Sequence, residues 1–368
     1  MGDQDEFVHE GLAGVVVTRT RLSHVDGERG RLLVAGHDVE HFAQRFDFEQ
    51  GSAQLWAAAE LDVGDLPARL EAAREAAFEA LPQLGDALRR EHAMDALRAA
   101  LAHCPEHSRP EELVAAAAVY TAAHARLHQG LAPLAPVRGQ RHAEALLGML
   151  GLANDPDRAR ALDVYLVCVL DHGLNASTFA ARVVASTQSD LVSAVVAAVG
   201  ALKGPLHGGA PGPVLDMLDA IGEPSRARSY LSAELEAGRR IMGMGHRIYR
   251  QRDPRALVLE RALTRLEQAL AARGDNTNAR ARQRLQLARA VEQEAAALLA
   301  QRHPERPLQV NVEFYTAVLL SALDIDARLF SALFACARVV GWIAHYTEQQ
   351  RHGRLIRPDA RYIGAVPD

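Results

Sequence analysis

The chain of 368 residues is longer than one hydrophobic core usually supports, so we expect two domains, or one large domain that carries a smaller one. Its composition is 49% hydrophobic but only 5% aromatic, which favours a mainly α fold over a sheet protein. The formal net charge of −5 gives no electrostatic reason to expect nucleic acid or an anionic membrane as a partner.

Cysteine spacing and the amino end both favour a cytoplasmic protein. The cysteines Cys104, Cys168 and Cys336 are isolated and show no paired spacing, as expected for reduced thiols. The first ten residues are acidic and lack the basic and apolar blocks of a signal peptide, so we expect no export. Apolar stretches at 113–125 and 191–202 are shorter than the roughly 20 residues that span a bilayer, and we interpret them as core helices.

Strand patterns occur only near the amino end. Residues 15–20 (VVVTRT) and 31–36 (RLLVAG) flank a turn that contains Asp26 and Gly27. Apolar segments separated by such a turn predict one or two small hairpins before helices take over.

Helical periodicity dominates the rest of the chain. Helices are expected near 162–170, 191–202, 213–222 and 256–270, followed by a turn at 274–278 and a long helix rich in Arg and Gln. Ser189 or Asp190 would cap the second of these helices, Pro213 suits the first turn of the third, and Gly222 would close it. Because no linker or repeat is apparent, a second domain would be inserted into the first.

Four stretches place catalytically capable side chains beside glycines or helix ends. They are DHGLNAST (171–178), GPLHGGAPG (204–212), GMGHRIYRQRDPRA (243–256) and NVEFYTA (311–317). Each is a weak signal alone, because a lone histidine usually serves structure. GMGHRI also lacks the preceding strand and the third glycine of a dinucleotide fingerprint.

Glu313 is the residue that most needs an explanation. It lies between Val312 and two aromatic residues, and nothing local pairs its carboxylate. One interpretation is a partly exposed acid in the first turn of a helix, where the helix dipole favours Glu. The other is a functional carboxylate.

The HARLH motif has two histidines, His124 and His128, at the i, i+4 spacing of metal ligands. It lacks the flanking Glu of a hydrolytic zinc helix. We therefore interpret it as structural and expect no metal site.

Together with FACARVVGWIAHYTEQ (334–349) and GRLIRPDARYIG (353–364), the four stretches appear in the order and wording of one family. The chain resembles citrate synthases from residue 11 to its carboxyl end, and six separate motifs agree. The resemblance implies a mainly α fold with the active site in a cleft. A large helical domain would comprise 1–207 and 317–368, and a smaller helical domain, 208–316, would be inserted between them.

The resemblance also implies a reaction and its partners. Family members act as homodimers that condense oxaloacetate with acetyl-CoA and release CoA when the citryl thioester is hydrolysed. Acetyl-CoA is a co-substrate, and no tightly bound cofactor is expected.

Forming a carbon nucleophile from a thioester methyl requires a base at the methyl and a hydrogen-bond donor at the carbonyl oxygen. The resemblance assigns His207 as this donor and His246 as the donor to the ketone of oxaloacetate, with Ser177 orienting His246. Most of the family has the base as Asp in NVDF, and this chain has Glu313 in NVEF. A branch of bacterial citrate synthases is similar to this chain in having NVEF, which favours Glu313 as the base.

Oxaloacetate carries two carboxylates, which planar guanidinium groups bind well. The resemblance implies Arg255, Arg338 and Arg357 as these groups, with His172 as a further ligand. Arg357 would come from the other subunit, so a monomer would be inactive.

The CoA phosphates and adenine would lie against the loop around GMGH. The resemblance implies Gly243 and Gly245 for close backbone approach and Arg250 as a basic side chain.

Two other functions remain open on sequence alone. A 2-methylcitrate synthase would use propionyl-CoA, and one methylene is worth only about 1–3 kcal/mol of discrimination. The chain could also be a non-catalytic, ligand-sensing homologue with an altered base.

Overall fold

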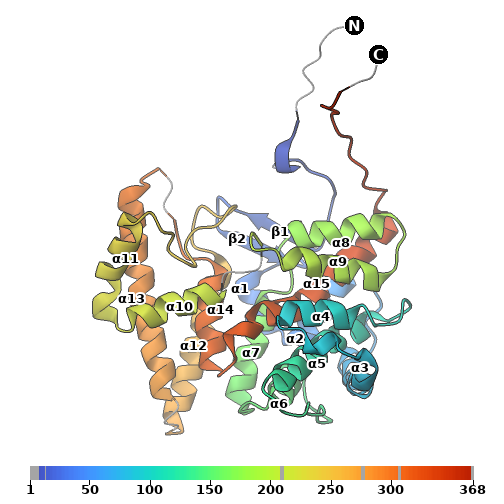
Figure 1. Cartoon of the computed structure of the whole chain (residues 1–368), viewed down its shortest axis with the longest axis horizontal. Helices are drawn as coiled ribbons and strands as arrows, with labels where there is room; N and C mark the ends of the chain where they lie inside the picture. Colours follow the sequence, from blue (N-terminus) through green and yellow to red (C-terminus); the bar gives the residue numbers. More distant parts are fainter. Residues whose placement is uncertain (1–7, 13, 208–210, 275–277, 306–307, 366–368) are drawn as a thin grey trace.

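The chain folds mainly into helices, as its composition predicts (Figure 1). The computed structural model describes residues 8–12, 14–207, 211–274, 278–305 and 308–365. The helices in chain order are α1 (Val39–Arg45), α2 (Phe48–Ala58), α3 (Leu66–Glu79), α4 (Ala93–Leu101), α5 (Pro110–His128), α6 (His142–Leu150), α7 (Pro156–Cys168), α8 (Ala176–Ser186), α9 (Leu191–Leu202), α10 (Pro211–Ile221), α11 (Ala227–Glu236), α12 (Pro254–Ala272), α13 (Asn278–Arg302), α14 (Val312–Ala322) and α15 (Phe330–His352).

Helix ends follow the local signals closely. Asp190, rather than Ser189, caps α9 by accepting the Ser193 N–H at 2.8 Å. Helix α10 begins at Pro211, so Pro213 lies in its first turn, and Gly222 follows it with a φ of 76°. Residues 275–277 of the predicted turn lie outside the described residues.

The amino-terminal sheet is antiparallel and has the order β1-β2-β3. Strand β1 (Ser23–Asp26) pairs with β2 (Arg31–Val34), which pairs with β3 (His37–Asp38). The prediction of a strand at 15–20 was wrong, because pairing begins only at Ser23. Residues 15–20 instead belong to an amino-terminal segment that projects from the body.

Helix α15 forms the centre of the core and packs against α5, α8 and α9. Residues Ala327–His352 are long and apolar enough to cross a membrane by length and composition alone. Within the fold, 78% of their most apolar window is buried, as in a core helix.

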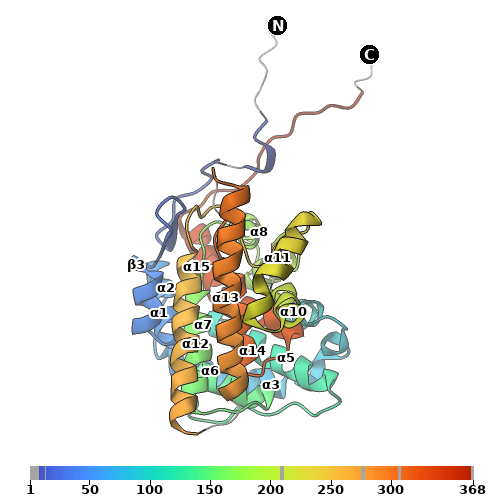
Figure 2. The same ribbon diagram turned by 90° about the vertical axis from the view of Figure 1, so that its left-hand side faces the viewer.

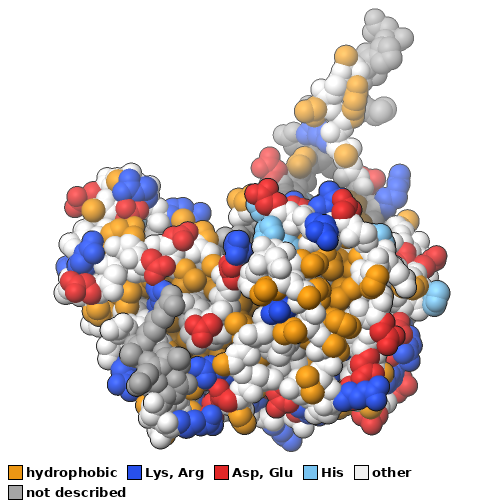
Figure 3. Space-filling model, turned by 60° about the horizontal axis from the view of Figure 1, so that its bottom comes forward, with side chains coloured by type: hydrophobic (Ala, Val, Ile, Leu, Met, Phe, Trp, Pro, Cys, Tyr) orange, Lys and Arg blue, Asp and Glu red, His pale blue; other side chains and the backbone are white. Residues whose placement is uncertain are grey.

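The elements α10, α11, α12 and α13 gather on one side of the molecule (Figure 1). Helices α12 and α13 run side by side there (Figure 2). The described segments nearest the two chain ends project from the same end of the body. On one face, hydrophobic side chains gather over the larger part of the molecule, with charged groups around them (Figure 3).

The HARLH histidines lie at the end of α5. The Nδ1 atom of His124 is 3.0 Å from the Leu88 carbonyl oxygen, and its ring centroid lies 5.1 Å from that of His128, with the two rings tilted by 30°. Among the residues that the structure describes, no group of three or more His, Cys, Asp or Glu side chains could hold a metal ion. Cys104, Cys168 and Cys336 are free thiols.

Candidate active site

The loop that carries His246 is held against the start of α14. Met244 and Val310 form an isolated antiparallel bridge, and the Asn311 N–H donates to the Gly243 carbonyl at 2.9 Å. Gly243 has a φ of 74°, and a Cβ atom there would lie 2.9 Å from Phe314. Only glycine fits this close approach, which fixes the loop beside the helix that begins with Glu313.

Asp253 joins this loop to the same helix end. Its buried carboxylate accepts two hydrogen bonds from the Arg255 guanidinium, at 3.0 and 2.8 Å, and one from the Val312 N–H at 3.2 Å. Burial lowers the pKa of Arg255, but Asp253 outweighs that effect and raises it overall. Arg255 is therefore a fixed cation beside the first turn of α14.

Glu313 lies in the first turn of α14 and is half-buried. Its position alone would therefore also fit an acid that serves only the start of the helix. The Asn311 side chain caps the helix by accepting the Glu313 N–H at 3.0 Å. Burial raises the pKa of the Glu313 carboxyl to about 7, although Arg255 opposes the rise. Such a carboxyl is poised to exchange a proton near neutral pH.

His246 is arranged as a neutral hydrogen-bond donor. Its Nδ1 atom accepts the backbone N–H groups of Ile248 at 3.0 Å and Tyr249 at 3.1 Å. Burial and then Arg255 lower the pKa of His246 to about 4. In the neutral ring the proton must therefore lie on Nε2.

His172 lies at the centre of the predicted site residues. Its ring centroid is 5.5 Å from that of His246, and its Nε2 atom is 3.0 Å from the Tyr249 hydroxyl. Burial lowers the pKa of His172 well below its usual value, and nearby basic side chains lower it further. These groups are Arg255, Arg338, His246 and His207.

Ser177 contacts His207, so the prediction that it orients His246 was wrong. The Ser177 Oγ atom is 2.9 Å from His207 Nε2, 2.8 Å from Asn175 Oδ1 and 3.2 Å from the Trp342 indole nitrogen. The backbone of α8 carries Ser177 toward the segment after α9, whereas His246 is oriented by its own loop. Burial, and then Arg338, lower the pKa of His207, which keeps its ring neutral at pH 7.

Arg338 enters the site from the middle of α15. It is buried, and neither its Nε nor its Nη1 atom has a hydrogen-bond partner among the described residues. Asp171 is its nearest acid, with Nη1 and Oδ1 3.6 Å apart. Burial lowers the pKa of Arg338 to about 10, so the group remains charged and can bind a carboxylate.

Arg357 is the one predicted oxaloacetate ligand that lies apart from the other three, which are His172, Arg255 and Arg338. It is exposed on the segment that leaves the body after α15. The neighbouring Ile356 N–H donates to Ser186 Oγ at 3.0 Å, which directs this segment along the end of α8.

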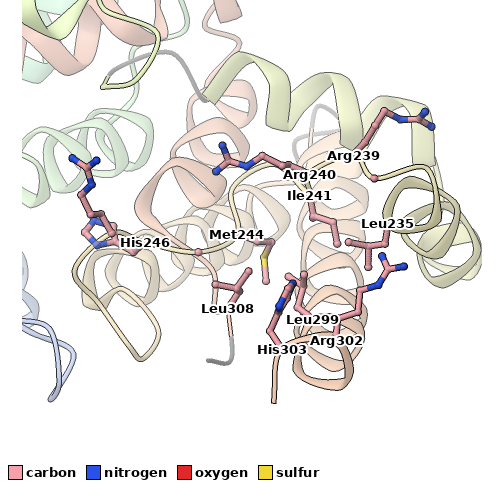
Figure 4. Close-up of a pocket in the computed structure, with 13 residues that line it drawn as sticks. Leu235, Arg239, Arg240, Ile241, Met244, His246, Leu299, Arg302, His303 and Leu308 are labelled. Carbon is pink, nitrogen blue, oxygen red and sulfur yellow. The ribbon is translucent and has the colours of Figure 1, made fainter. Parts of the chain in front are cut away.

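A cavity of about 720 Å³ lies next to His246 (Figure 4). Its basic and apolar lining comes from the 235–247 segment on one side and from α13 and Leu308 on the other. The basic side chains are Arg239, Arg240, Arg247, Arg302, His246 and His303. Such a site suits an anion with a substantial apolar or aromatic part.

Sequence reasoning found Gly245 in this lining but missed most of its basic residues. Arg250 lies outside it, and its Nε atom is 3.9 Å from Glu28. The adjacent Arg239 and Arg240 just before GMGH were a local signal that could have found the cavity. Arg302 and His303 are more than 50 residues away in sequence and meet the loop only in the fold.

Comparison with known proteins identifies the family. The family model described as citrate synthase, C-terminal domain, matches residues 11–359. A Deinococcus radiodurans protein named citrate synthase is 35% identical over 97% of this chain and 96% of its own length. A Mycobacterium tuberculosis protein named 2-methylcitrate synthase is 33% identical over 98% of this chain and 92% of its own.

A local match is stronger in identity but shorter. The Mycobacterium tuberculosis protein named putative citrate synthase 2 is 45% identical over 58% of this chain, and the match spans about half of that protein, 53%. Among solved structures, Thermoplasma acidophilum citrate synthase in ternary complex with carboxymethyl coenzyme A and oxaloacetate has a TM-score of 0.83 and 25% identity. That match covers 98% of this chain and 97% of the other.

Proposed function

Because this chain belongs to the citrate synthase family, we propose that it condenses oxaloacetate with acetyl-CoA and water to give citrate and CoA. The observation that carries the proposal is that Arg255, a buried cation, lies near both Glu313, a carboxyl whose pKa burial raises to about 7, and His246, a neutral donor. A ligand-sensing homologue has no need of a carboxyl poised in this way.

In the proposed reaction, the Glu313 carboxylate removes a proton from the thioester methyl while His207 donates to the thioester oxygen. The resulting carbon attacks the ketone of oxaloacetate, and His246 Nε2 donates its proton to the oxygen that becomes an alkoxide. Water then hydrolyses the citryl thioester and releases CoA. A Glu313 pKa near 7 suits this step, because a base works best when its pKa is close to the working pH.

Oxaloacetate would be held by Arg338, Arg255 and His172. The unpaired Nε and Nη1 atoms of Arg338 can each donate to a carboxylate oxygen, and the fixed guanidinium of Arg255 supplies a second positive group. Acetyl-CoA would enter through the basic cavity beside Gly245 and His246, where its phosphates meet the arginines and its adenine meets the apolar wall.

We also propose that two copies form a homodimer in which Arg357 completes the partner's site. In support, Arg357 is exposed and remote from its own cluster, and one face of the body carries a gathering of hydrophobic side chains. The proposed compartment is the cytoplasm, and the proposed small domain is 208–316, within which α10, α11, α12 and α13 lie together.

The 2-methylcitrate synthase reaction is the second candidate, because a relative of that name matches nearly as well. Release of free CoA thiol from acetyl-CoA plus oxaloacetate, with mass-spectrometric detection of citrate, tests the proposed function. The ratio of kcat/KM for acetyl-CoA to that for propionyl-CoA should exceed one. A ratio well below one would make propionyl-CoA the substrate, and no thiol release from either would leave a non-catalytic protein.

Oxaloacetate alone should close the protein, because its proposed ligands come from α15 on one side and from the first turn of α12 on the other. Small-angle scattering should show a smaller radius of gyration with oxaloacetate than without it. Acetyl-CoA alone should not have this effect. An unchanged radius at saturating oxaloacetate would contradict ordered closure.

A further inference from the structure

Behind Arg338 lies a row of buried side chains that the proposed reaction does not use. It runs from Glu348 through Arg182 and His345 to Asp171, and every member is almost fully buried. The sequence motif GWIAHYTEQ contains two of these residues, yet only its neighbour Arg338 was assigned a role.

The hydrogen bonds in this row fix the proton on His345. Arg182 Nε lies 2.9 Å from His345 Nδ1, and because a guanidinium only donates, Nδ1 must accept. The proton of the neutral ring therefore lies on Nε2, which is 3.2 Å from Asp171 Oδ2. His345 is thus a fixed donor to the carboxylate that faces Arg338.

Arg182 is itself held firmly. Its two terminal nitrogens donate to Gln349, at 3.0 Å, and to Glu348. A second oxygen of Glu348 accepts the Arg21 N–H at 2.9 Å. Because all three nitrogens of the Arg182 guanidinium donate hydrogen bonds, the group cannot turn to release His345.

Asp171 joins this row to the site in two ways. One oxygen, Oδ2, accepts from His345 and from the Ser23 hydroxyl, while Oδ1 faces Arg338 Nη1 at 3.6 Å. Although burial raises the pKa of Asp171, His345 and Arg338 hold it below its usual range, so the carboxylate stays charged. Asp171 also directly precedes His172, the second proposed oxaloacetate ligand on this side.

We propose that His345 is a positioning residue for oxaloacetate binding, which acts by holding the Asp171 carboxylate in the orientation that aims Arg338 into the cleft. It touches no substrate. Without the Nε2–H group of His345, the Ser23 hydroxyl is the one hydrogen-bond donor that remains on Asp171 Oδ2 among the residues that the structure describes. The carboxylate can then turn toward the free donors of Arg338 and compete with the substrate for them.

The test compares three substitutions by calorimetric titration with oxaloacetate and by steady-state kinetics. His345→Gln places an amide nitrogen close to the position of Nε2, His345→Asn places one close to Nδ1, and His345→Leu removes both. Losing a hydrogen bond to a charged group should weaken oxaloacetate binding about ten- to a hundredfold in the Leu and Asn variants. His345→Gln should lie within about threefold of wild type, and the KM for acetyl-CoA should change least.

His142→Leu is the matched control, because His142 is a fully buried histidine that stacks 4.3 Å from Phe48 in another part of the core. Neither ring nitrogen of His142 has a hydrogen-bond partner among the described residues, and this variant should leave oxaloacetate affinity within about twofold of wild type. The positioning role would be overturned if His345→Gln and His345→Asn bound oxaloacetate equally tightly. It would also be overturned if His142→Leu lost as much oxaloacetate affinity as His345→Leu.

The inference rests on the proposed function, and the two can fail separately. Wild-type protein that binds no oxaloacetate would contradict the proposed function itself. If the wild-type protein binds oxaloacetate and the folded His345→Asn variant binds it equally tightly, the proposed function stands and the role of His345 is rejected. Should the Leu variant fail to fold, the Gln and Asn pair decides the question.

Discussion

Glu313→Gln is expected to lower turnover by at least about 10²- to 10⁴-fold while oxaloacetate still binds. The amide cannot accept the methyl proton, but the proposed oxaloacetate ligands, Arg255 and Arg338, are untouched. Steady-state kinetics and calorimetric titration on the same preparation measure the two effects. Near-normal turnover in this variant would show that Glu313 is not the base.

Glu49→Gln is the matched control for this substitution. Glu49 is also a buried carboxyl whose pKa is raised by burial. In the core it accepts a hydrogen bond from the backbone N–H of His142 at 2.8 Å. An amide oxygen can accept the same bond, so turnover should stay within about twofold of wild type. A comparable loss in both variants would indicate general damage to the fold.

Melting curves provide a second control, with a defined sign. The folded pKa of Glu313, about 7, lies above the ordinary value of 4.5, so the folded protein holds this proton more tightly than the unfolded chain does. This group therefore makes stability fall as the pH rises from about 4.5 to 7. The difference in melting temperature between Glu313→Gln and wild type should therefore be more favourable to the variant at pH 8 than at pH 4.5.

Glu313→Asp tests whether the site is built for the longer side chain. Glu reaches about 1.5 Å further than Asp, and a misplacement near 1 Å can cost about 10²-fold in rate. The start of α14 is held by Asp253 and by the Asn311 to Gly243 hydrogen bond, so the backbone cannot advance to compensate. We expect about a 10²-fold loss, whereas a faster enzyme would show that the site keeps aspartate geometry.

Mixed dimers should recover activity from two inactive chains. Arg357→Leu removes the residue proposed to cross the interface, and His246→Ala removes a donor in the body of the site. In a mixed dimer one site collects both lesions and the other collects neither. Random pairing makes half of the dimers mixed, so about a quarter of the wild-type sites should return.

Thiol release after mixing, at equal chain concentrations, measures this recovery. Each variant alone is the baseline, and exchange of subunits must be shown independently, for example with differently tagged chains. No recovery among demonstrably mixed dimers would place Arg357 in the site of its own chain or outside any site.

Local signals predicted the helices well, and tertiary contacts account for what was missed. The Asp190 cap, the Gly222 end and the start of α14 depend on residues within one turn, which the sequence displays directly. The failed strand at 15–20 had the right composition, but no described strand pairs with it. A strand needs a neighbour, and composition does not supply one.

In the candidate site too, local motifs were predicted from the sequence and contacts between distant segments were not. The motifs identified the histidines and arginines, and the fold brings His172, His207, His246, Arg255 and Arg338 together. The partner of Ser177 and the basic lining from α13 depend on how distant segments pack, so the sequence could not supply them. The row behind Arg338 was hidden for the same reason, because its hydrogen bonds join Asp171 and Arg182 to residues of α15 that are more than 150 positions further along the chain.

The pH dependence of kcat/KM for acetyl-CoA, with oxaloacetate held saturating, tests most directly whether a carboxyl with a raised pKa is the base. Loss of thioester absorbance follows the reaction at every pH, and circular dichroism confirms that the chain stays folded. Only ionised Glu313 can accept the proton. His246 is already neutral at pH 6 to 8, because its pKa is lowered to about 4, and burial also lowers the pKa of His207. The account predicts that kcat/KM rises about tenfold per pH unit up to about pH 7 and then levels off. A profile that is flat from pH 5.5 to 8.5 in the folded protein would contradict it.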